Sequence, residues 1–257
     1  AGDVHYEFRS WQGKIEDFQP EDGIRFKLAL ADPPYFISQR VGEFHFTDKA
    51  GKSHTPMVRD FGEWDAFKDS EDYLSQAAAW LQTIYSHTDD PGWCWLWCSY
   101  TFISQLREAA ILAGWTPAGW FTWIKPNAPP VLGSINAQVV DGIEPLLILR
   151  KGAARMETNG GVVRNYWEAP LVSAKERGKV GVPERNLAQK PELLLRDIVG
   201  WCSQPGDWVL DAFSGTGSGS LAALQEQRSA YAVEVAGGMI GSLRDRVRDR
   251  FGLQEGL

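Results

Sequence analysis

Four residues that could bind an amino group stand together at the end of an apolar run. Phe26–Ala31 is followed at once by Asp32, Pro33, Pro34 and Tyr35. The run predicts a short buried strand, which the prolines must end because neither can donate to a sheet ladder. Asp32 and the Pro33 carbonyl could accept the two N–H hydrogens of an amino group, while Tyr35 stacks on the ring that carries it. A plain strand-to-turn junction is the alternative interpretation.

A second group of residues that could bind a ligand lies near the other end of the chain. Asp211–Gly217 (Asp-Ala-Phe-Ser-Gly-Thr-Gly) follows a short apolar run, and Glu234 follows the next one. A glycine turn lets a ligand approach the backbone closely, and an acid after the next strand can accept both hydroxyls of a ribose. A dinucleotide-binding turn would place its third glycine at Ser220, and it lacks an acid like Asp211 directly before the turn. We therefore favour S-adenosylmethionine (AdoMet) over a nicotinamide or flavin cofactor.

The hydrophobic pattern around these motifs predicts alternating strands and helices. Residues 93–98 are apolar on both faces, which is typical of a central strand in a parallel sheet. The sequence predicts no helix or strand in residues 1–24 and 151–188. The predicted strands span residues 25–32, 93–98, 120–124, 143–149, 208–210 and 230–233, and the predicted helices span 71–86, 101–113, 218–227, a segment starting at Pro191 and a last segment reaching Phe251. We expect an α/β fold with a doubly wound, mostly parallel sheet.

Composition limits the class of protein. The chain has 257 residues, of which 44% are hydrophobic, and it shows no low-complexity linker or internal repeat. We therefore expect a single domain over residues 1–257. Three cysteines are too few for a disulfide framework and favour an intracellular, cytoplasmic location. No apolar stretch approaches a membrane span and no signal-peptide core is present, so we expect no membrane partner and no secretion.

Charge is unevenly distributed along the chain. The formal net charge of -7 argues against a nonspecific nucleic-acid binder. Residues 150–190, however, carry nine Lys or Arg against four acids. This basic segment and the polar loop 36–69 are candidate DNA contacts, with a solvated surface as the alternative for the basic segment. His45 and His54 in the loop lack the supporting ligands of a metal site, so no metal is expected.

The two motifs and their order resemble those of β-class DNA amino methyltransferases. The resemblance covers roughly residues 25–250 and extends to Asn186–Pro191 (Asn-Leu-Ala-Gln-Lys-Pro) and Pro205–Gly217. In that family the catalytic motif precedes the cofactor motif, with the target-recognition segment between them. Segments 123–126 and 142–145 also lie where family members carry comparable motifs. The chain departs from the family pattern at residues 186–188, Ala212 and Thr216.

The resemblance implies a Rossmann-like AdoMet-dependent methyltransferase. It implies a catalytic half at residues 25–150, a target-recognition segment at 151–188 and an AdoMet-binding half at 189–252. The implied catalytic residues are Asp32, Pro33, Pro34 and Tyr35. The residues expected to bind AdoMet are Ala31, Asp32, Lys190, Asp211, Ala212, Phe213, Ser214, Gly215, Thr216, Gly217, Glu234 and Val235. Members of the family are often homodimers, and many belong to restriction-modification systems, which we expect here too.

The implied reaction is methyl transfer to the exocyclic N6 of an adenine rotated out of the DNA duplex. Asp at position 32 favours adenine, because family members that act on cytosine N4 more often carry Ser there. Cytosine C5 methylation is disfavoured, since no cysteine lies in a motif that would supply its nucleophile. RNA, protein glutamine and an inactive nucleic-acid-binding partner subunit stay open as alternatives. The glutamine enzymes place the cofactor motif first, and the intact Asp32–Tyr35 motif with Glu234 argues against an inactive subunit.

Overall fold

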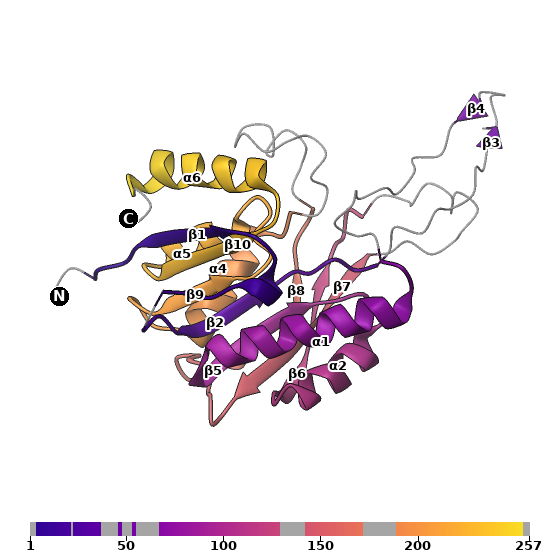
Figure 1. Cartoon of the computed structure of the whole chain (residues 1–257), viewed down its shortest axis with the longest axis horizontal. Helices are drawn as coiled ribbons and strands as arrows, with labels where there is room; N and C mark the ends of the chain where they lie inside the picture. The colour runs from indigo at the N-terminus through magenta and orange to yellow at the C-terminus, as the bar shows by residue number, and fades with distance from the viewer. Residues whose placement is uncertain are drawn as a thin grey trace.

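The chain folds around one eight-stranded sheet. The computed structural model describes residues 4–21, 23–36, 46–47, 53–54, 67–128, 142–171 and 189–253 (Figure 1). In spatial order the strands are β1 (Phe8–Gln12), β10 (Ser229–Glu234), β9 (Trp208–Asp211), β2 (Phe26–Ala31), β5 (Thr88–Trp97), β7 (Ile143–Lys151), β6 (Thr116–Ile124) and β8 (Tyr166–Glu168). Two short strands, β3 (Phe46–Thr47) and β4 (Ser53–His54), form a separate antiparallel pair.

All six predicted strands are present, and the sheet is mostly parallel. Strand β7 is the exception, because it runs antiparallel to both β5 and β6. The sequence predicts that residues 93–98 form a strand of a parallel sheet. This is correct for the pairing of β5 with β2, which is parallel, and wrong for its pairing with β7, which is antiparallel. Strands β1 and β8 lie at the two edges of the sheet, in segments for which no element is predicted. A half-exposed edge strand lacks the continuous apolar run that reveals a central strand.

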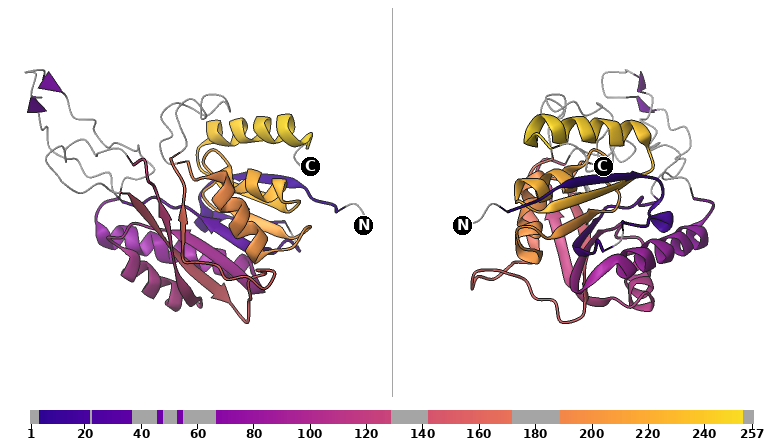
Figure 2. Two further views of the ribbon diagram at one scale, coloured as in Figure 1. Left: turned by 180° about the vertical axis from the view of Figure 1, so that it is seen from behind. Right: turned by 60° about the vertical axis from the view of Figure 1, so that its left-hand side comes forward.

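Helices cover both faces of the sheet (Figures 1 and 2). Helices α1 (Ser70–His87) and α2 (Ile103–Leu112) lie side by side on one face, which the 3-10 helix η1 (Ile15–Asp17) also covers. Helices α4 (Glu192–Cys202), α5 (Ser218–Gln225) and α6 (Gly237–Phe251) pack on the other. The expected doubly wound architecture is thus confirmed. Pro191 caps α4 instead of forming its first residue.

Strand β2 shows why the sheet needs both layers of helices. Leu28 and Leu30 belong to the core under α4, α5 and α6, whereas Ala29 and Ala31 belong to the core under α1 and α2. All four side chains are at most 3% exposed. Because successive side chains of a strand point to opposite faces, a run buried on both sides must be apolar throughout. Among the described residues, no helix combines the length and apolarity needed to cross a membrane.

The connections reverse direction between β2 and β9. Strand β9 leads into α5 on one face, and β2 leads through α1 on the opposite face to β5. The two strands pair in parallel, with Leu30 opposite Asp211, and the Ala212 amide continues the ladder by donating to the Leu30 carbonyl at 2.9 Å. Their carboxyl ends therefore open side by side at the point where the strand order reverses. Ligands of open α/β sheets bind at such a point.

The turn from β9 into α5 depends on glycine. Gly215 and Gly217 have φ values of +49° and +81°, in the left-handed region that favours glycine. A Cβ at Gly217 would also collide with the Leu243 side chain of α6. The turn thus brings the chain directly against α6, and it positions the first turn of α5 over the end of β9.

Asp211 lies beneath the start of α5. One of its carboxylate oxygens accepts hydrogen bonds from the Ser220 amide at 2.7 Å and from the Ser220 hydroxyl at 2.8 Å. Burial raises the pKa of this carboxyl to about 6, although the Ser220 hydrogen bonds oppose the rise. A Cβ added at Gly219 would come within 2.8 Å of the Asp211 carboxyl carbon. Asp211 therefore ties β9 to α5 from inside the core.

Replacing Gly217 by alanine should destabilise the protein. The strained φ angle and the collision with Leu243 together should lower the free energy of unfolding by about 2–4 kcal/mol, measured by chemical denaturation. Gly241→Ala in α6 is the matched control, because a Cβ there meets no atom within 4 Å. The control should be neutral or slightly stabilising, since alanine is the better helix former. Equal stability of the two variants would contradict this account of the turn.

Asp211→Asn tests the burial of the carboxyl. A group with a pKa of about 6 in the fold and an ordinary value of 3.8 costs stability above pH 6, and the cost disappears as the pH falls toward 4. Asparagine keeps an oxygen acceptor for Ser220 but does not titrate. The Tm of the wild type relative to the variant should therefore rise when thermal melts are moved from about pH 7 to about pH 4. A difference that does not vary with pH would count against a raised pKa.

Candidate active site

The predicted catalytic motif leaves the sheet at the end of β2. Pro33 is buried, whereas Asp32, Pro34 and Tyr35 are partly exposed at the carboxyl edge. The Tyr35 hydroxyl donates a hydrogen bond of 2.8 Å to Asp32 Oδ1 and lies 3.4 Å from Glu144 Oε2. The Asp32 side chain is 29% exposed, so it is reachable from solvent and still held by its neighbours. The motif therefore has the stiff support that the sequence predicts.

An aromatic cluster anchors the residue that follows the motif. Phe36 has a φ of +53°, which is uncommon for a residue with a side chain and marks a constrained turn. Its ring stacks on Tyr73 of α1, with centroids 5.8 Å apart, and meets Phe67 edge-on at 5.5 Å. Trp80 of α1 extends the cluster to Phe213 of the glycine turn at 5.3 Å. The catalytic and glycine-rich loops thus share one packed support.

A network of ionic side chains joins the motif to two other parts of the chain. The ammonium nitrogen of Lys190 lies 2.9 Å from Asp32 Oδ2 and 3.1 Å from Glu144 Oε2. Glu144 Oε1 is in turn 3.2 Å from the ammonium of Lys125. Lys190 also lies over the Tyr35 ring, 5.2 Å from its centroid. These side chains come from the ends of β2, β6 and β7 and from the residues that precede α4.

The pKa values in this network follow from burial and from the neighbouring charges. Burial raises the pKa of the Asp32 carboxyl, an effect that Lys190 opposes. Burial would also raise the pKa of Glu144, but Lys190 and Lys125 together hold it below its ordinary value. Burial alone would lower the pKa of Lys190, whereas the two carboxylates raise it above its ordinary value. Burial and the adjacent carboxylates raise the pKa of Tyr35, which keeps its phenol neutral.

The sequence motifs assign no role to Glu144 or Lys125, and the resemblance places Lys190 at the cofactor. The structure brings all three side chains to the catalytic motif. A signal for Glu144 is nevertheless present, because a single acid inside the otherwise apolar strand 143–149 is expensive to bury without a partner. Its partners could not be identified from spacing, since Lys190 is 46 positions further along the chain.

The glycine turn and Glu234 form a second part of the same edge. One Glu234 oxygen accepts from the Gly215 amide at 2.8 Å and the other from the Ala236 amide at 2.9 Å. A carboxylate oxygen has two lone pairs, so each can accept one more hydrogen bond. Val235 is 50% exposed beside it. A ligand hydroxyl could therefore reach Glu234 without breaking the turn.

Other residues of the turn are packed against the body of the protein. The Thr216 carbonyl accepts a hydrogen bond from the Arg246 side chain of α6, so this arginine contacts the turn. Ala212 and Ser214 are nearly fully buried, and the Ser214 hydroxyl has no hydrogen-bond partner among the described residues. A buried hydroxyl without a partner is suited to a bound polar ligand. The glycines, the acid and this hydroxyl thus fit the chemistry of a nucleoside cofactor such as AdoMet.

The three cysteines are inert in this fold. Cys94, Cys98 and Cys202 are buried free thiols. Burial raises the pKa of Cys98 and of Cys202 to about 12, and it raises that of Cys94 further. Because the thiolate is the reactive form, none of the three can serve as a nucleophile near neutral pH. Groups of three or more metal-ligating side chains are absent from the described part of the chain.

Only some of the basic side chains in segment 150–190 are exposed on the surface. The Lys151 ammonium donates to the carbonyls of Tyr85 and Thr88 at the end of α1, and Lys190 lies in the ionic network. Arg155 and Arg164 are exposed. Residues 172–188 and most of the loop 36–69 lie outside the described residues. The prediction of DNA contacts in these two segments therefore stays a prediction.

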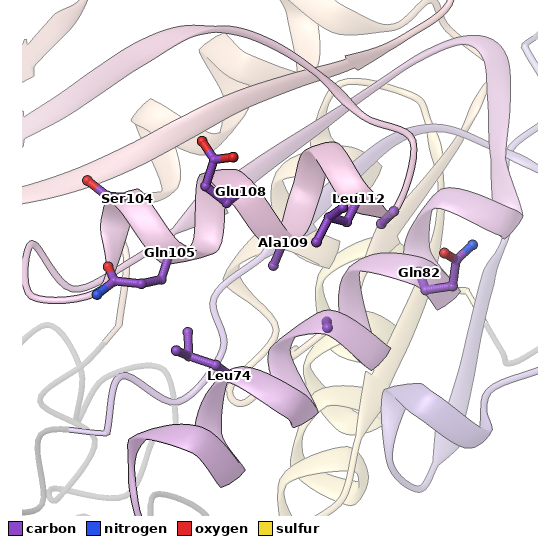
Figure 3. Close-up of a pocket in the computed structure, with 9 residues that line it drawn as sticks. Leu74, Gln82, Ser104, Gln105, Glu108, Ala109 and Leu112 are labelled. Carbon is purple, nitrogen blue, oxygen red and sulfur yellow. The ribbon is translucent and has the colours of Figure 1, made fainter.

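A groove of about 540 Å³ lies elsewhere, between α1 and α2 (Figure 3). Leu74 and Gln82 of α1 lie on one side of it, and Gln105, Ala109 and Leu112 of α2 lie on the other. None of the predicted catalytic or cofactor residues lines this groove. The chemistry therefore has to be sought at the sheet edge, where Asp32, the glycine turn and Glu234 converge.

Two curated relatives match nearly all of the chain. A type II methyltransferase of Haemophilus influenzae, M.HinfI, is 27% identical over 246 residues, which are 91% of this chain and 66% of that protein. A second, M2.MboI of Moraxella bovis, is 23% identical over 239 residues, which are 88% of this chain and 82% of that protein. The chain thus spans about two thirds of the length of M.HinfI and more of M2.MboI.

Two solved structures share the fold. The M1.HpyAVI complex with SAM has a TM-score of 0.67 and 18% identity, covering 93% of this chain and 98% of that one. The PvuII DNA methyltransferase, described as cytosine-N4-specific, has a TM-score of 0.69 and 16% identity, covering 96% of this chain and 89% of that one. These similarities confirm the predicted Rossmann-like methyltransferase fold.

One family model matches most of the chain. It describes a DNA methylase of the N6/N4 type and matches residues 26–240, which include Asp32–Tyr35, Asp211–Gly217 and Glu234 in the predicted order. The match covers well over half of the chain. The protein therefore belongs to the N6/N4 DNA methylase family, as the sequence motifs predict.

Proposed function

We propose that this protein transfers a methyl group from AdoMet to the exocyclic N6 of an adenine in DNA. The observation that carries the proposal is the convergence of Asp32, the glycine turn and Glu234 at the one sheet edge where the strand order reverses. Membership of the N6/N4 family supports amino methylation of DNA. The protein thereby joins an acceptor site for an amino group to a cofactor site.

The catalytic motif would bind the target amino group. Asp32 and the Pro33 carbonyl would accept its two hydrogens and so favour the pyramidal nitrogen that attacks the methyl carbon. Pro33 and Pro34 hold these acceptors on a stiff backbone. The base would stack on Tyr35, on the ring face opposite Lys190.

AdoMet supplies a methyl group on a sulfonium, which is already an excellent leaving group. In the transfer the N–C bond forms as the S–C bond breaks, the sulfur keeps that electron pair, and the amine passes one proton to solvent. The protein's task is to align the two reactants and to surround the amine, which becomes positive, with carboxylate charge. Asp32, directly after β2, would supply this carboxylate charge.

The cofactor residues would divide the work between them. Glu234 would accept both ribose hydroxyls, which its two remaining lone pairs allow. The glycines would let AdoMet lie close to the backbone, and the Ser214 hydroxyl would gain a partner. The other proposed contacts are Ala31, Asp32, Lys190, Asp211, Ala212, Phe213, Thr216 and Val235.

Adenine is proposed over cytosine because of the acid at position 32. Cytosine N4 remains the alternative, since the cytosine-N4-specific PvuII enzyme has the same fold. The geometry for accepting an amino group would serve either base. The inert thiols argue against cytosine C5 chemistry, which needs a cysteine nucleophile.

The remaining proposals concern DNA and organisation. We propose that residues 151–188 recognise the target and that they contact DNA together with the loop 36–69. We also propose one methyltransferase domain, with a catalytic half at residues 25–150 and a cofactor half at 189–252, and assembly as a homodimer. The exposed Arg155 and Arg164 support the DNA contacts, because cations neutralise phosphate.

Product analysis tests the reaction. The protein is incubated with labelled AdoMet and unmethylated DNA, and the methylated nucleoside is identified by mass spectrometry. N6-methyladenine is expected from the wild type, and Asp32→Ala should lower the transfer at least about 100-fold, with a much smaller loss of AdoMet binding. Detection of N4-methylcytosine instead would change the proposed target base to cytosine and leave the proposed mechanism of methyl transfer unchanged. AdoMet binding without transfer to single- or double-stranded DNA would overturn the proposed substrate.

Calorimetry tests the cofactor site. Glu234→Ala removes the proposed ribose acceptor and should weaken AdoMet binding by about 10-fold or more, since a buried hydrogen bond to a charged group contributes roughly 1.5–3 kcal/mol. Glu108→Ala on the exposed side of α2 is the control and should bind normally. Unchanged affinity of the Glu234 variant would refute its role.

A further inference from the structure

The ionic network around Lys190 raises a problem for the proposed mechanism. Both Asp32 oxygens already carry a donor, Oδ1 from the Tyr35 hydroxyl and Oδ2 from the Lys190 ammonium. The amino group of a target base must bind to the same carboxylate. An ammonium held at 2.9 Å would also neutralise the charge that the developing cation of the transition state needs. Each Asp32 oxygen still has a second lone pair. It is therefore the positive charge of Lys190, more than its hydrogen bond, that has to be drawn away from Asp32 during transfer, and Lys190 has to keep a counter-ion while this happens.

Glu144 is placed to receive it. Its Oε2 is 3.1 Å from the Lys190 ammonium, about as close as Asp32 Oδ2 at 2.9 Å. The Lys190 side chain is only 6% exposed and that of Glu144 is 19% exposed. A buried ammonium that loses its carboxylate partners is strongly destabilising, so Lys190 could not release Asp32 toward solvent. With Glu144 in place, only a shift of the shared ammonium is needed.

The antiparallel strand β7 accounts for the position of Glu144. The parallel strands β2 and β5 end at the catalytic edge, whereas β7 begins there because it runs the other way. Glu144 is the second residue of β7, and Lys125, which directly follows β6, holds its other oxygen at 3.2 Å. These two carboxylates and two ammonium groups thus balance in charge. The Lys190 ammonium can shift from Asp32 toward Glu144 without changing the net charge of the network.

We propose that Glu144 is a positioning residue for methyl transfer, which takes over the Lys190 ammonium when the target amino group binds Asp32. The inference rests on the proposed role of Asp32 and applies to adenine N6 and cytosine N4 alike. Glu144 acts through Lys190 and does not contact the substrate. Lys190, in turn, keeps Asp32 ionised and occupied until the base arrives.

The test is a double-mutant cycle in single-turnover methyl transfer at saturating AdoMet and DNA. Glu144→Gln keeps the shape of the side chain but leaves Asp32 as the carboxylate that holds Lys190 among the described residues. The rate should therefore fall about 10- to 100-fold, while the Kd for AdoMet changes less than about 3-fold. Lys190→Met removes the competing donor. Adding it to Glu144→Gln should therefore cost far less than it does in the wild type, or should even recover part of the rate.

Controls separate this inference from folding and from the proposed function. Tm is measured for every variant to detect a loss of folding. If Glu144→Gln does not fold, Glu144→Asp replaces it in the test. The aspartate variant has a shorter side chain that draws the carboxylate away from Lys190, so it should lose part of the rate. Glu108→Gln on α2 should retain the wild-type rate. An unchanged rate in Glu144→Gln, or losses that multiply in the double variant, would overturn the inference. A wild type that transfers no methyl group to DNA would instead defeat the proposed function.

Discussion

The parallel pairing of β2 with β9 is the constraint on which the rest of the site depends. It joins a strand from residue 26 to one from residue 208, and it aligns Leu30 with Asp211. The chain leaves these strands toward opposite faces, through α5 and α1, so neither of these two helices crosses between their carboxyl ends. The catalytic motif and the glycine turn then open into one space, although some 180 residues separate them.

Rigidity around this space comes from packing as well as from backbone. The ring of Phe36 holds the chain directly after the catalytic motif, and the same aromatic cluster reaches Phe213 in the glycine turn through Trp80. A positive φ at Phe36 persists because these rings fix it. The two reactants would thus be aligned by a common support, which matters because methyl transfer depends on in-line geometry.

Charge in the site is organised as a balanced and partly buried network. Each carboxylate has an ammonium within 3.2 Å, and the pKa of Glu144 is lowered by those cations despite its burial. Such a network keeps its ions only while every member is paired. It can therefore respond to a substrate that competes for one member, which a solvent-exposed pair could not do as selectively.

The sequence by itself determined the two motifs, their order, the six central strands and the family, because buried runs and glycine turns are local patterns. Tertiary structure alone decided the edge strands β1 and β8, the direction of β7 and the meeting of Lys190 with Asp32 and Glu144. Strand direction and side-chain partners depend on contacts between distant segments, and no local pattern encodes them. Lys190 is assigned to the cofactor from its motif, whereas the folded chain places its ammonium on Asp32.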